Sequence, residues 1–150
     1  MRLSAREQTG LRTMIALARS YGQGPIALTR IAQQEELPLA YLEQIARHLR
    51  RAGLLGSARG ARGGYFLLRN PAEISVSEIL SALEGQLVSL DCLSEHPVAC
   101  GRASACEARG VWLRVQDCLQ HTLDAMTLAD VLFEPVGESL SRILGYLESR

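Results

Sequence analysis

Apolar residues recur at helical spacing near the start of the chain and predict a helix over residues 4–20. Ser4 is followed three residues later by Glu7, which is the pattern of a capping box. The stretch "YGQGP" (21–25) contains two glycines and a proline, which end a helix. The residues that form the apolar side of this helix are Leu11, Met14, Ile15 and Ala18.

Two further helical segments follow this turn. A short helix begins near Thr29, and "EELP" predicts a tight turn before a longer helix from about Pro38 to Arg51, where proline suits the first turn. Gly53 ends the longer helix. Its apolar face consists of Leu42, Ile45, Ala46 and Leu49, and its polar face of Glu43, Gln44, Arg47, His48, Arg50 and Arg51. Helix, turn and helix in this order are typical of a DNA-binding unit.

A β-hairpin is predicted directly after the longer helix. Its strands are Leu54–Ser57 and Tyr65–Leu68, and "ARGARGG" between them contains the glycines that a tight loop needs. Arg59 and Arg62 lie at the tip, where guanidinium groups suit a narrow minor groove. A glycine-rich loop can also hold a nucleotide phosphate, but no helix follows this one directly. The pattern therefore favours a winged helix.

Three more helices are predicted in the second half of the chain. Pro71 begins a linker, and "SVSEILSALEGQ" predicts a short helix that ends at Gly85. A loop over 91–110 shows no periodicity, and a helix then runs from Val111 to about Met126. An extended piece and a final amphipathic helix follow. The apolar stripe of the long helix, Trp112, Val115, Leu119, Leu123 and Met126, is typical of packing against a partner chain.

Charge divides the chain into two unlike halves. Residues 1–70 contain 11 Arg and 4 Glu, a net charge of +7, whereas residues 71–150 contain 5 Arg and 12 Asp and Glu, a net charge of −7. Lysine is absent. The basic half is expected to meet a polyanion, and the arginines and glutamine of the Pro38–Arg51 helix can reach phosphates and base edges.

Length and hydropathy narrow the class of protein. A chain of 150 residues allows one packed domain, or a small domain with an extension. The sequence contains no run of about 18 apolar residues, so it predicts no transmembrane helix. Charged residues interrupt the N-terminal apolar residues, so the apolar core of a signal peptide is missing. We therefore expect a cytoplasmic protein whose thiols stay reduced. The scattered histidines and the lack of paired carboxylates indicate that it is not an enzyme.

Three of the four cysteines lie in the segment "DCLSEHPVACGRASACEARG" (91–110). Cys92, Cys100 and Cys106 have seven and then five residues between them, so no pair has the C-x-x-C spacing of a zinc knuckle or a redox dithiol. A metal or cluster site, a disulfide and plain thiols are all compatible with this spacing. Cys118 fits the apolar stripe better, as a buried core thiol.

Four stretches together resemble one family of bacterial regulators. "YLEQIARHLRRAGLL", "RGARGGYFL", "ISVSEILSALEG" and the three cysteines are similar to the winged-helix iron–sulfur cluster regulators (IscR-like), which include nitric-oxide-responsive and iron-responsive repressors. The resemblance implies a homodimer that reads a palindromic operator, with a long helix crossing to the partner. It also implies that Cys92, Cys100 and Cys106 hold a [2Fe–2S] cluster, or in some relatives [4Fe–4S].

Pattern and resemblance together assign the DNA-binding residues. Tyr41 and Gln44 match recognition-helix positions of the family, and Arg59 matches its wing arginine. The wing reads Gly60-Ala61-Arg62-Gly63-Gly64 where relatives have G-x-G-G-G, which adds a charge, and Pro38 and Ala40 replace residues that often form hydrogen bonds. The predicted DNA-binding set is Thr29, Tyr41, Glu43, Gln44, Arg47, Arg50, Arg51, Arg59 and Arg62.

The fourth cluster ligand is left open by the sequence. Some relatives have a histidine three residues after the last cysteine, but this position is Arg109, which cannot bind the cluster. Glu43 is the leading candidate, ahead of Glu7 and His96. A carboxylate on the DNA face opposes phosphate unless it accepts from a cytosine amino group, so base discrimination is the favoured role of Glu43. A cluster that captured Glu43 would remove this repulsion.

The predicted fold class is mainly α with a small β-wing, a winged helix-turn-helix domain followed by a long dimerisation helix. The predicted divisions are a DNA-binding domain (1–70), a connecting helix and linker (71–90), a cysteine loop (91–110) and a dimerisation helix with an amphipathic tail (111–150). We predict a cluster-sensing repressor of iron–sulfur biogenesis genes that binds double-stranded operator DNA as a homodimer, without a membrane or a small-molecule substrate. A nitric-oxide or iron sensor, a structural-zinc regulator and a thiol sensor are the alternatives.

Overall fold

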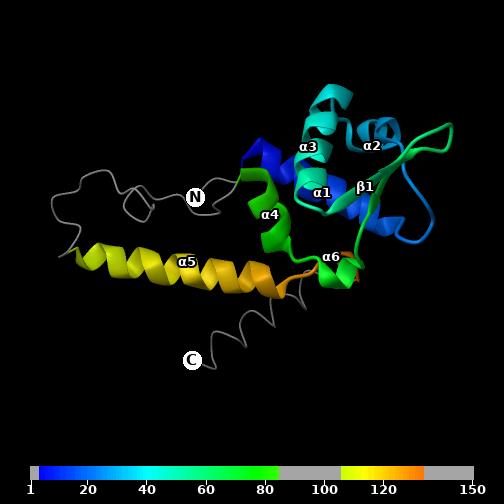
Figure 1. Cartoon of the computed structure of the whole chain (residues 1–150). Coiled ribbons are helices and arrows are strands. Elements are labelled where there is room, and N and C mark those ends of the chain that lie inside the picture. The colour runs from blue at the N-terminus through cyan, green and yellow to red at the C-terminus, as the bar shows by residue number, and fades with distance from the viewer. Residues whose placement is uncertain (1–3, 85–105, 134–150) are drawn as a thin grey trace.

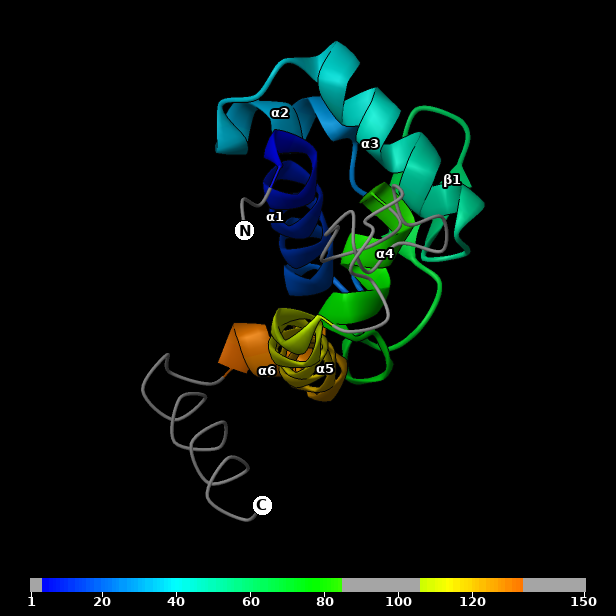
Figure 2. The ribbon, with the colours of Figure 1, turned by 90° about the vertical axis from the view of Figure 1, so that its left-hand side faces the viewer.

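The computed structural model describes residues 4–84 and 106–133 of the chain. Cys92, His96, Cys100 and the predicted C-terminal amphipathic helix lie outside the described residues. In Figure 1, helices α1 to α4 and the hairpin form one compact group, from which helix α5 extends to one side. Figure 2 views α5 nearly end-on and shows it beside α6, below the other helices.

Helix α1 (Ala5–Arg19) begins with the predicted capping box. The Ser4 hydroxyl accepts from the Glu7 backbone N–H at 3.1 Å, and a Glu7 carboxylate oxygen accepts from the Ser4 N–H at 2.6 Å. These bonds satisfy two N–H groups that a helix start otherwise leaves unpaired. The helix ends before Gly22 and Gly24, both of which have positive φ. The sequence prediction for this helix is confirmed.

Helices α2 (Leu28–Glu35) and α3 (Leu39–Arg51) form the predicted helix-turn-helix. The turn contains Glu36 in the left-handed conformation, with a φ of 54°. Arg12 of α1 holds the end of α2, because its guanidinium lies 2.7 Å from the Glu35 carboxylate and donates to the Glu35 carbonyl at 3.2 Å. Pro38 is the N-cap of α3, one position before the first turn in which we expected it.

The hairpin consists of strands β1 (Leu55–Ala58) and β2 (Gly64–Leu67), each within one residue of its prediction. They pair antiparallel, with Leu55 opposite Leu67. Ile26 adds a short bridge to β2, because its N–H and carbonyl each bond to Tyr65, at 2.9 and 2.8 Å. A Cβ at Gly64 would lie 2.3 Å from the Ile26 carbonyl carbon, so this close approach requires glycine.

The second half contains a 3-10 turn (Pro71–Glu73) and helices α4 (Val76–Glu84), α5 (Glu107–Ala125) and α6 (Leu128–Phe133). Helix α5 begins four residues before Val111, so the end of the predicted cysteine loop is helical. The extended piece predicted after Met126 is wrong, since α6 occupies its start. Thr127 and Asp130 cap α6 reciprocally: the Thr127 N–H donates to the Asp130 carboxylate at 2.8 Å, and the Asp130 N–H to the Thr127 hydroxyl at 3.2 Å. This "TLAD" capping signal was present in the sequence.

The hydrophobic core lies between α1, α2, α3, α4 and the hairpin, with one residue from α6. Gly10 allows α1 and α4 to approach closely, because a Cβ there would lie 2.2 Å from a Leu83 methyl group. Neither described range contains a helix that combines the length and the apolar character needed to cross a membrane. The largest fully buried core side chains include Met14, Leu42, Leu49, Ile79 and Leu128.

Candidate DNA-binding surface

Helix α3 separates its residues into a buried and an exposed face, as predicted. Leu42, Ile45, Ala46 and Leu49 are buried in the core of the same chain. The opposite face is left to solvent, so its side chains are available to a partner. The exposed residues of that face are Glu43, Gln44, Arg47, Arg50 and Arg51.

Two of the predicted DNA-binding residues on α3 have roles within the chain. Tyr41 is half-buried and packs against the core. Arg50 donates to the Ser57 hydroxyl at 3.3 Å, which links α3 to strand β1. Contact with the wing leaves most of this exposed guanidinium free for a phosphate. Tyr41 therefore exposes only part of its ring, whereas Arg50 also holds the helix beside the hairpin.

The tip of the hairpin projects away from the helices (Figure 1). Arg59 and Arg62 are both exposed on it, and Gly60 between them has a φ of 109°, a conformation that favours glycine. Two arginines on a projecting loop present positive charge at a distance from α3. They can therefore contact a second stretch of the same duplex while α3 contacts the first.

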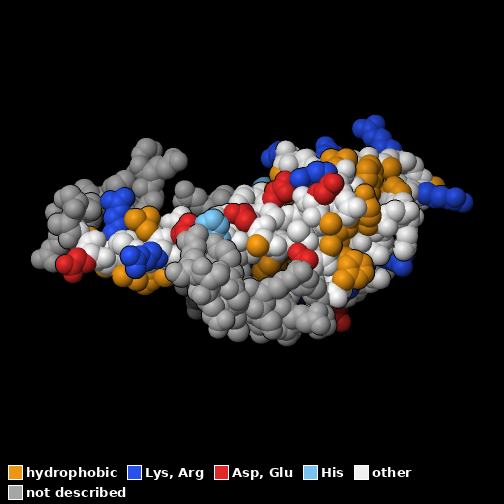
Figure 3. Space-filling view, turned by 90° about the horizontal axis from the view of Figure 1, so that it is seen from below, with side chains coloured by type: hydrophobic (Ala, Val, Ile, Leu, Met, Phe, Trp, Pro, Cys, Tyr) orange, Lys and Arg blue, Asp and Glu red, His pale blue; other side chains and the backbone are white. Residues whose placement is uncertain are grey.

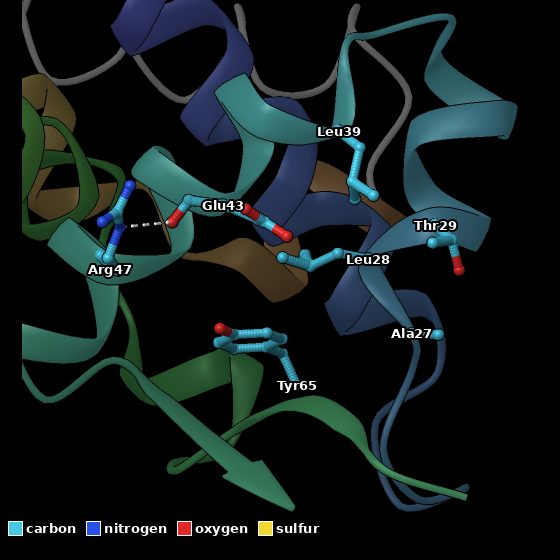
Figure 4. Close-up of a pocket in the computed structure, with 7 residues that line it drawn as sticks. All are labelled: Ala27, Leu28, Thr29, Leu39, Glu43, Arg47 and Tyr65. Atoms are coloured by element: carbon cyan, nitrogen blue, oxygen red, sulfur yellow. Dashed lines mark hydrogen bonds between the residues drawn. The ribbon is translucent and has the colours of Figure 1, made fainter. Parts of the chain in front are cut away.

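A cleft of about 420 Å³ lies between α2, α3 and the hairpin. Figure 4 shows Leu39, Glu43 and Arg47 following one another along α3, with Thr29 on α2 and the Tyr65 ring on the opposite wall. The Arg47 side chain donates to the Glu43 backbone carbonyl at 3.3 Å. The cleft thus brings together Thr29, Glu43 and Arg47, three residues that the sequence predicted separately.

The sequence did not predict the cleft residues Leu39 and Tyr65. The sequence pattern identifies Leu39 only as part of a helix and Tyr65 only as part of a strand. The Ile26 bridge that positions Tyr65 joins segments about 40 residues apart in the sequence. An aromatic residue directly after a glycine-rich hairpin loop was the available signal for Tyr65. For Leu39, the available signal was an apolar residue at the first position of a helix whose core face begins three residues later.

Helix α5 lacks a buried face in the single chain. All of its residues are described and none of them is buried. Val111 is 58% exposed and Trp112 is 44% exposed, and hydrophobic side chains are visible along α5 in Figure 3. Cys118 is only half-buried here, so the predicted buried thiol is not found within one chain. An apolar helix left in water in this way is typical of a surface that another chain covers.

The C-terminal end of α5 is joined to the DNA-binding half. The Gln120 side chain donates to the Ser77 hydroxyl of α4 at 2.6 Å and to the Asp124 carboxylate at 3.0 Å. Backbone bonds from Val76 to Met126 (2.8 Å) and from Leu128 to Ile74 (2.9 Å) tie the segment after α5 to the start of α4. A shift of α5 would therefore act on α4 and, through their close packing, on α1.

The candidate cluster ligands within the described ranges lie far apart. Cys106 is exposed at the N-cap of α5, and its thiol makes no capping hydrogen bond. Glu7 is 5% exposed and occupied by the capping box, whereas Glu43 lines the cleft on α3. In Figure 1 the start of α5 lies at the far end of that helix, well away from α3 in the group of α1 to α4. Residues 4–84 and 106–133 contain no group of three His, Cys, Asp or Glu that could hold a metal ion.

Comparison with known proteins identifies the family. Residues 3–134 match the family described as Rrf2, iron-dependent transcriptional regulator. This chain belongs to the Rrf2 family. Its winged-helix fold and its role as a DNA-binding transcriptional regulator are thereby confirmed. The resemblance to iron–sulfur cluster regulators is also confirmed, since IscR proteins are among its relatives.

Rrf2-family relatives of two kinds are similar to this chain. The transcriptional regulator CymR of Bacillus subtilis is 38% identical over 138 residues, which cover 92% of this chain and 94% of CymR. IscR of Escherichia coli O139:H28 is 30% identical over 132 residues, covering 88% and 80% of the two chains.

Solved structures show the same two kinds. The structure of CymR, described as the global cysteine regulator of B. subtilis, has a TM-score of 0.73 and 37% identity, covering 88% of this chain and 96% of CymR. T. potens IscR has a TM-score of 0.72 and 36% identity, covering 88% of this chain and 86% of that one. Family membership alone therefore does not choose between an IscR-like and a CymR-like signal.

Proposed function

We propose that this Rrf2-family regulator senses iron–sulfur clusters and represses genes of cluster biogenesis, binding palindromic operator DNA as a homodimer. The observation that carries the proposal is the position of Cys106. Its exposed thiol lies where the cysteine-rich segment enters α5, the helix with an uncovered apolar face. A ligand held by this thiol would act directly on the start of the proposed dimerisation helix.

The chemistry of the donor set fits a cluster. Thiolates are the usual ligands of iron–sulfur clusters, and Cys106 makes no capping bond that would compete. In the proposal, Cys92, Cys100 and Cys106 hold a [2Fe–2S] cluster, or alternatively a [4Fe–4S] cluster, which supplies redox and ligand-exchange chemistry when bound. Glu43 remains the leading candidate for the fourth ligand, with Glu7 and His96 behind it.

The chain's own residues would carry the signal to DNA. Cys106 is the N-cap of α5, and its carbonyl accepts from the Arg109 N–H at 3.1 Å. The Gln120–Ser77 bond and the backbone bonds at 74–76 and 126–128 would pass a change in α5 to α4. Helix α4 packs on α1, and α1 holds the end of α2 through Arg12. Occupancy of the thiols thereby shifts the population of the DNA-binding arrangement of α3.

The dimer in this proposal forms through α5. Val111, Trp112, Leu113 and Val115 are large apolar residues within one helix, and each is between 41% and 58% exposed. Trp112 and Val115 are three residues apart and lie on one side of the helix, so a second copy of α5 can cover both, as in other helix pairs. Two winged helices held by one pair of α5 helices then match the two halves of a palindromic operator.

The test is anaerobic purification followed by absorption and Mössbauer spectroscopy. Cys106→Ala should abolish the visible absorption of the cluster, whereas Cys118→Ala should retain it, because Cys118 lies in the middle of α5 and outside the proposed set. Glu43→Ala, Glu7→Gln and His96→Ala then identify the fourth ligand by a changed spectrum. A colourless protein with one zinc ion per chain would contradict the proposal in favour of structural zinc.

A thiol-based regulator is the second candidate. The similarity to CymR, a cysteine regulator, is as strong as the similarity to IscR, and it favours this candidate together with the exposed Cys106 thiol. Operator binding separates the two. Cluster sensing predicts that the Kd differs between the apo and cluster-loaded forms under anaerobic conditions. Thiol sensing predicts that the Kd of the apo protein changes on oxidation and is restored by a reductant.

A further inference from the structure

We infer that Leu39 reads the methyl group of one thymine in each operator half-site, and so determines part of the sequence specificity. This inference rests on the proposed binding of operator DNA through α3. It assigns a role to an apolar residue, whereas the predicted DNA-binding set contains only polar and charged residues and the partly buried Tyr41.

Leu39 occupies the position from which a recognition helix reads bases. It is the first residue of α3 and follows the N-cap Pro38. In helix-turn-helix proteins the N-terminal residues of the second helix reach the base edges, whereas residues further along meet the backbone. Leu39 is 37% exposed, although the apolar residues of α3 that follow it on the core face are fully buried. The fold therefore leaves this leucine outside the core.

The neighbours of Leu39 place it on the DNA face. Leu39, Glu43 and Arg47 are spaced by four residues, which puts them on one side of the helix, and all three line the cleft. Figure 4 shows the Leu39 side chain directed into the same space as the Glu43 carboxylate. Arg47 adds a positive charge that phosphate attracts. Leu39 is thus the apolar side chain that α3 contributes to the cleft, beside two charged residues of the same helix.

The chemistry of the major groove selects the partner of such a side chain. Of the four bases, only thymine presents a methyl group there, while the other edges present hydrogen-bond donors and acceptors. A leucine cannot satisfy those polar groups, but it can remove a methyl group from water. Leu39 would therefore favour thymine over cytosine at one position, next to the base pair that Glu43 contacts.

A purely structural role for Leu39 makes a different prediction. Leu28, which is buried, also lines the cleft. If Leu39 served only to contact Leu28, it would stabilise the turn between α2 and α3. Removal of the Leu39 side chain would then weaken binding to every duplex by the same factor. If Leu39 reads a base, its removal abolishes the effect of the methyl group of one thymine on the Kd. An experiment can therefore separate the two roles.

The experiment measures binding of the full-length protein to duplexes selected from a randomised pool. Each thymine of the selected half-site is replaced in turn by uracil, which removes the methyl group and nothing else. For the wild type we expect one position where uracil raises the Kd about fourfold in one half-site and about fifteenfold in both, as for the burial of one methyl group. In Leu39→Ala, uracil at that position should have no effect.

Leu68→Ala is the matched control, because Leu68 is an exposed leucine outside the cleft, and it should keep the wild-type response to uracil. Leu39→Met is a second variant that keeps an apolar side chain and should retain part of the response. Equal uracil effects in wild type and Leu39→Ala, or none at any thymine in the wild type, would overturn the inference. Failure to enrich any sequence from the pool would instead overturn the proposed DNA-binding function.

Discussion

Helices α3 and α5 both contain apolar residues at helical spacing, but only α3 buries them in the single chain. Helix α3 buries its apolar face completely, with Leu42 and Leu49 inaccessible to solvent, and leaves its arginines exposed. Helix α5 is longer, at 19 residues, yet it buries none of them. The difference shows that α3 finds its packing surface within residues 4–84 and 106–133, with Leu128 of α6 in the same core. Helix α5 finds no such surface in these described ranges.

The consequence of this difference concerns how the two regions are stabilised. The contacts of α3 are made within its own chain, so they depend only on folding. The described part of the chain buries no residue of α5, so a partner that covered its apolar face would add burial, and the stability of α5 would then depend on protein concentration. A ligand held at Cys106, as proposed, would therefore act on the helix that has no buried residue of its own.

The largest effect is expected from the buried face of α3. Leu49→Ala should lower the free energy of unfolding by about 2 to 5 kcal/mol, since it removes a fully buried side chain and leaves a cavity. Guanidinium denaturation monitored by circular dichroism measures the change. Arg51→Ala, at an exposed position two residues further along α3, is the control and should change stability by about 0.5 kcal/mol or less. If Leu49→Ala hardly changed the free energy of unfolding, the contrast between a packed α3 and an unpacked α5 would be wrong.

The exposed face of α5 should respond in oligomeric state and not in fold. The double variant Trp112→Glu and Val115→Glu should weaken dimerisation by about 30-fold or more, because charges replace the central apolar residues of the proposed interface. Sedimentation velocity over a range of concentrations tests this, and circular dichroism should still report a folded DNA-binding half. Arg114→Ala, between the two positions, should leave the dimer intact. A double variant that stays dimeric would show that α5 is covered in another way.

The exposed face of α3 should respond in DNA affinity alone. Arg47→Ala should weaken operator binding about tenfold and reduce the slope of log K against log salt by about 0.9 for each phosphate that is no longer neutralised. Fluorescence anisotropy at several salt concentrations measures both, and the unfolding midpoint should not change. Arg114→Ala serves again as the control, because it lies on α5. An unchanged salt slope would place Arg47 away from the phosphates.

The smallest effect is expected at the joint between the two regions. Gln120→Ala should destabilise the protein by about 1 kcal/mol, since it removes the bond to the buried Ser77 hydroxyl. Its more informative readout is the difference in operator Kd between the two signal states, which should shrink if this bond couples α5 to α4. Thr122→Ala is the control, because its hydroxyl bonds only within α5, to the Cys118 carbonyl. If the difference in operator Kd between the two signal states were the same in both variants, the Gln120–Ser77 bond would not couple α5 to α4. The backbone bonds between the two segments would then carry the coupling.

Much of the DNA-binding half was predictable because its signals are local. The Ser4–Glu7 capping box, the glycines of the hairpin and the period of Leu42, Ile45 and Leu49 each act within a few residues, and the structure confirms them. The start of α5 was harder to predict, because Glu107 to Gly110 have no apolar periodicity. Helix α6 was missed although Thr127 and Asp130 form a capping pair, because six residues are too few to show a period.

The candidate site was predictable only in part, for a related reason. Exposed arginines on α3 and on the hairpin tip follow from charge and helical period, which the sequence contains in full. The cleft does not, because it depends on how three elements meet. Tyr65 reaches its wall through the bridge to Ile26, and Leu39 reaches the same space through the αL turn at Glu36. Such positions depend on contacts between segments distant in sequence.

The sequence by itself determined the elements, the division of charge and the family to which the chain belongs, since periodicity, capping residues and motif spacing are properties of neighbouring residues. Only the tertiary structure decided which apolar faces are covered. It buried the face of α3 against α1 and α4 and left that of α5 in solvent, because burial depends on the surfaces available after the chain has folded. The same distinction separates Leu39, exposed in the cleft, from the leucines of α3 that form the core.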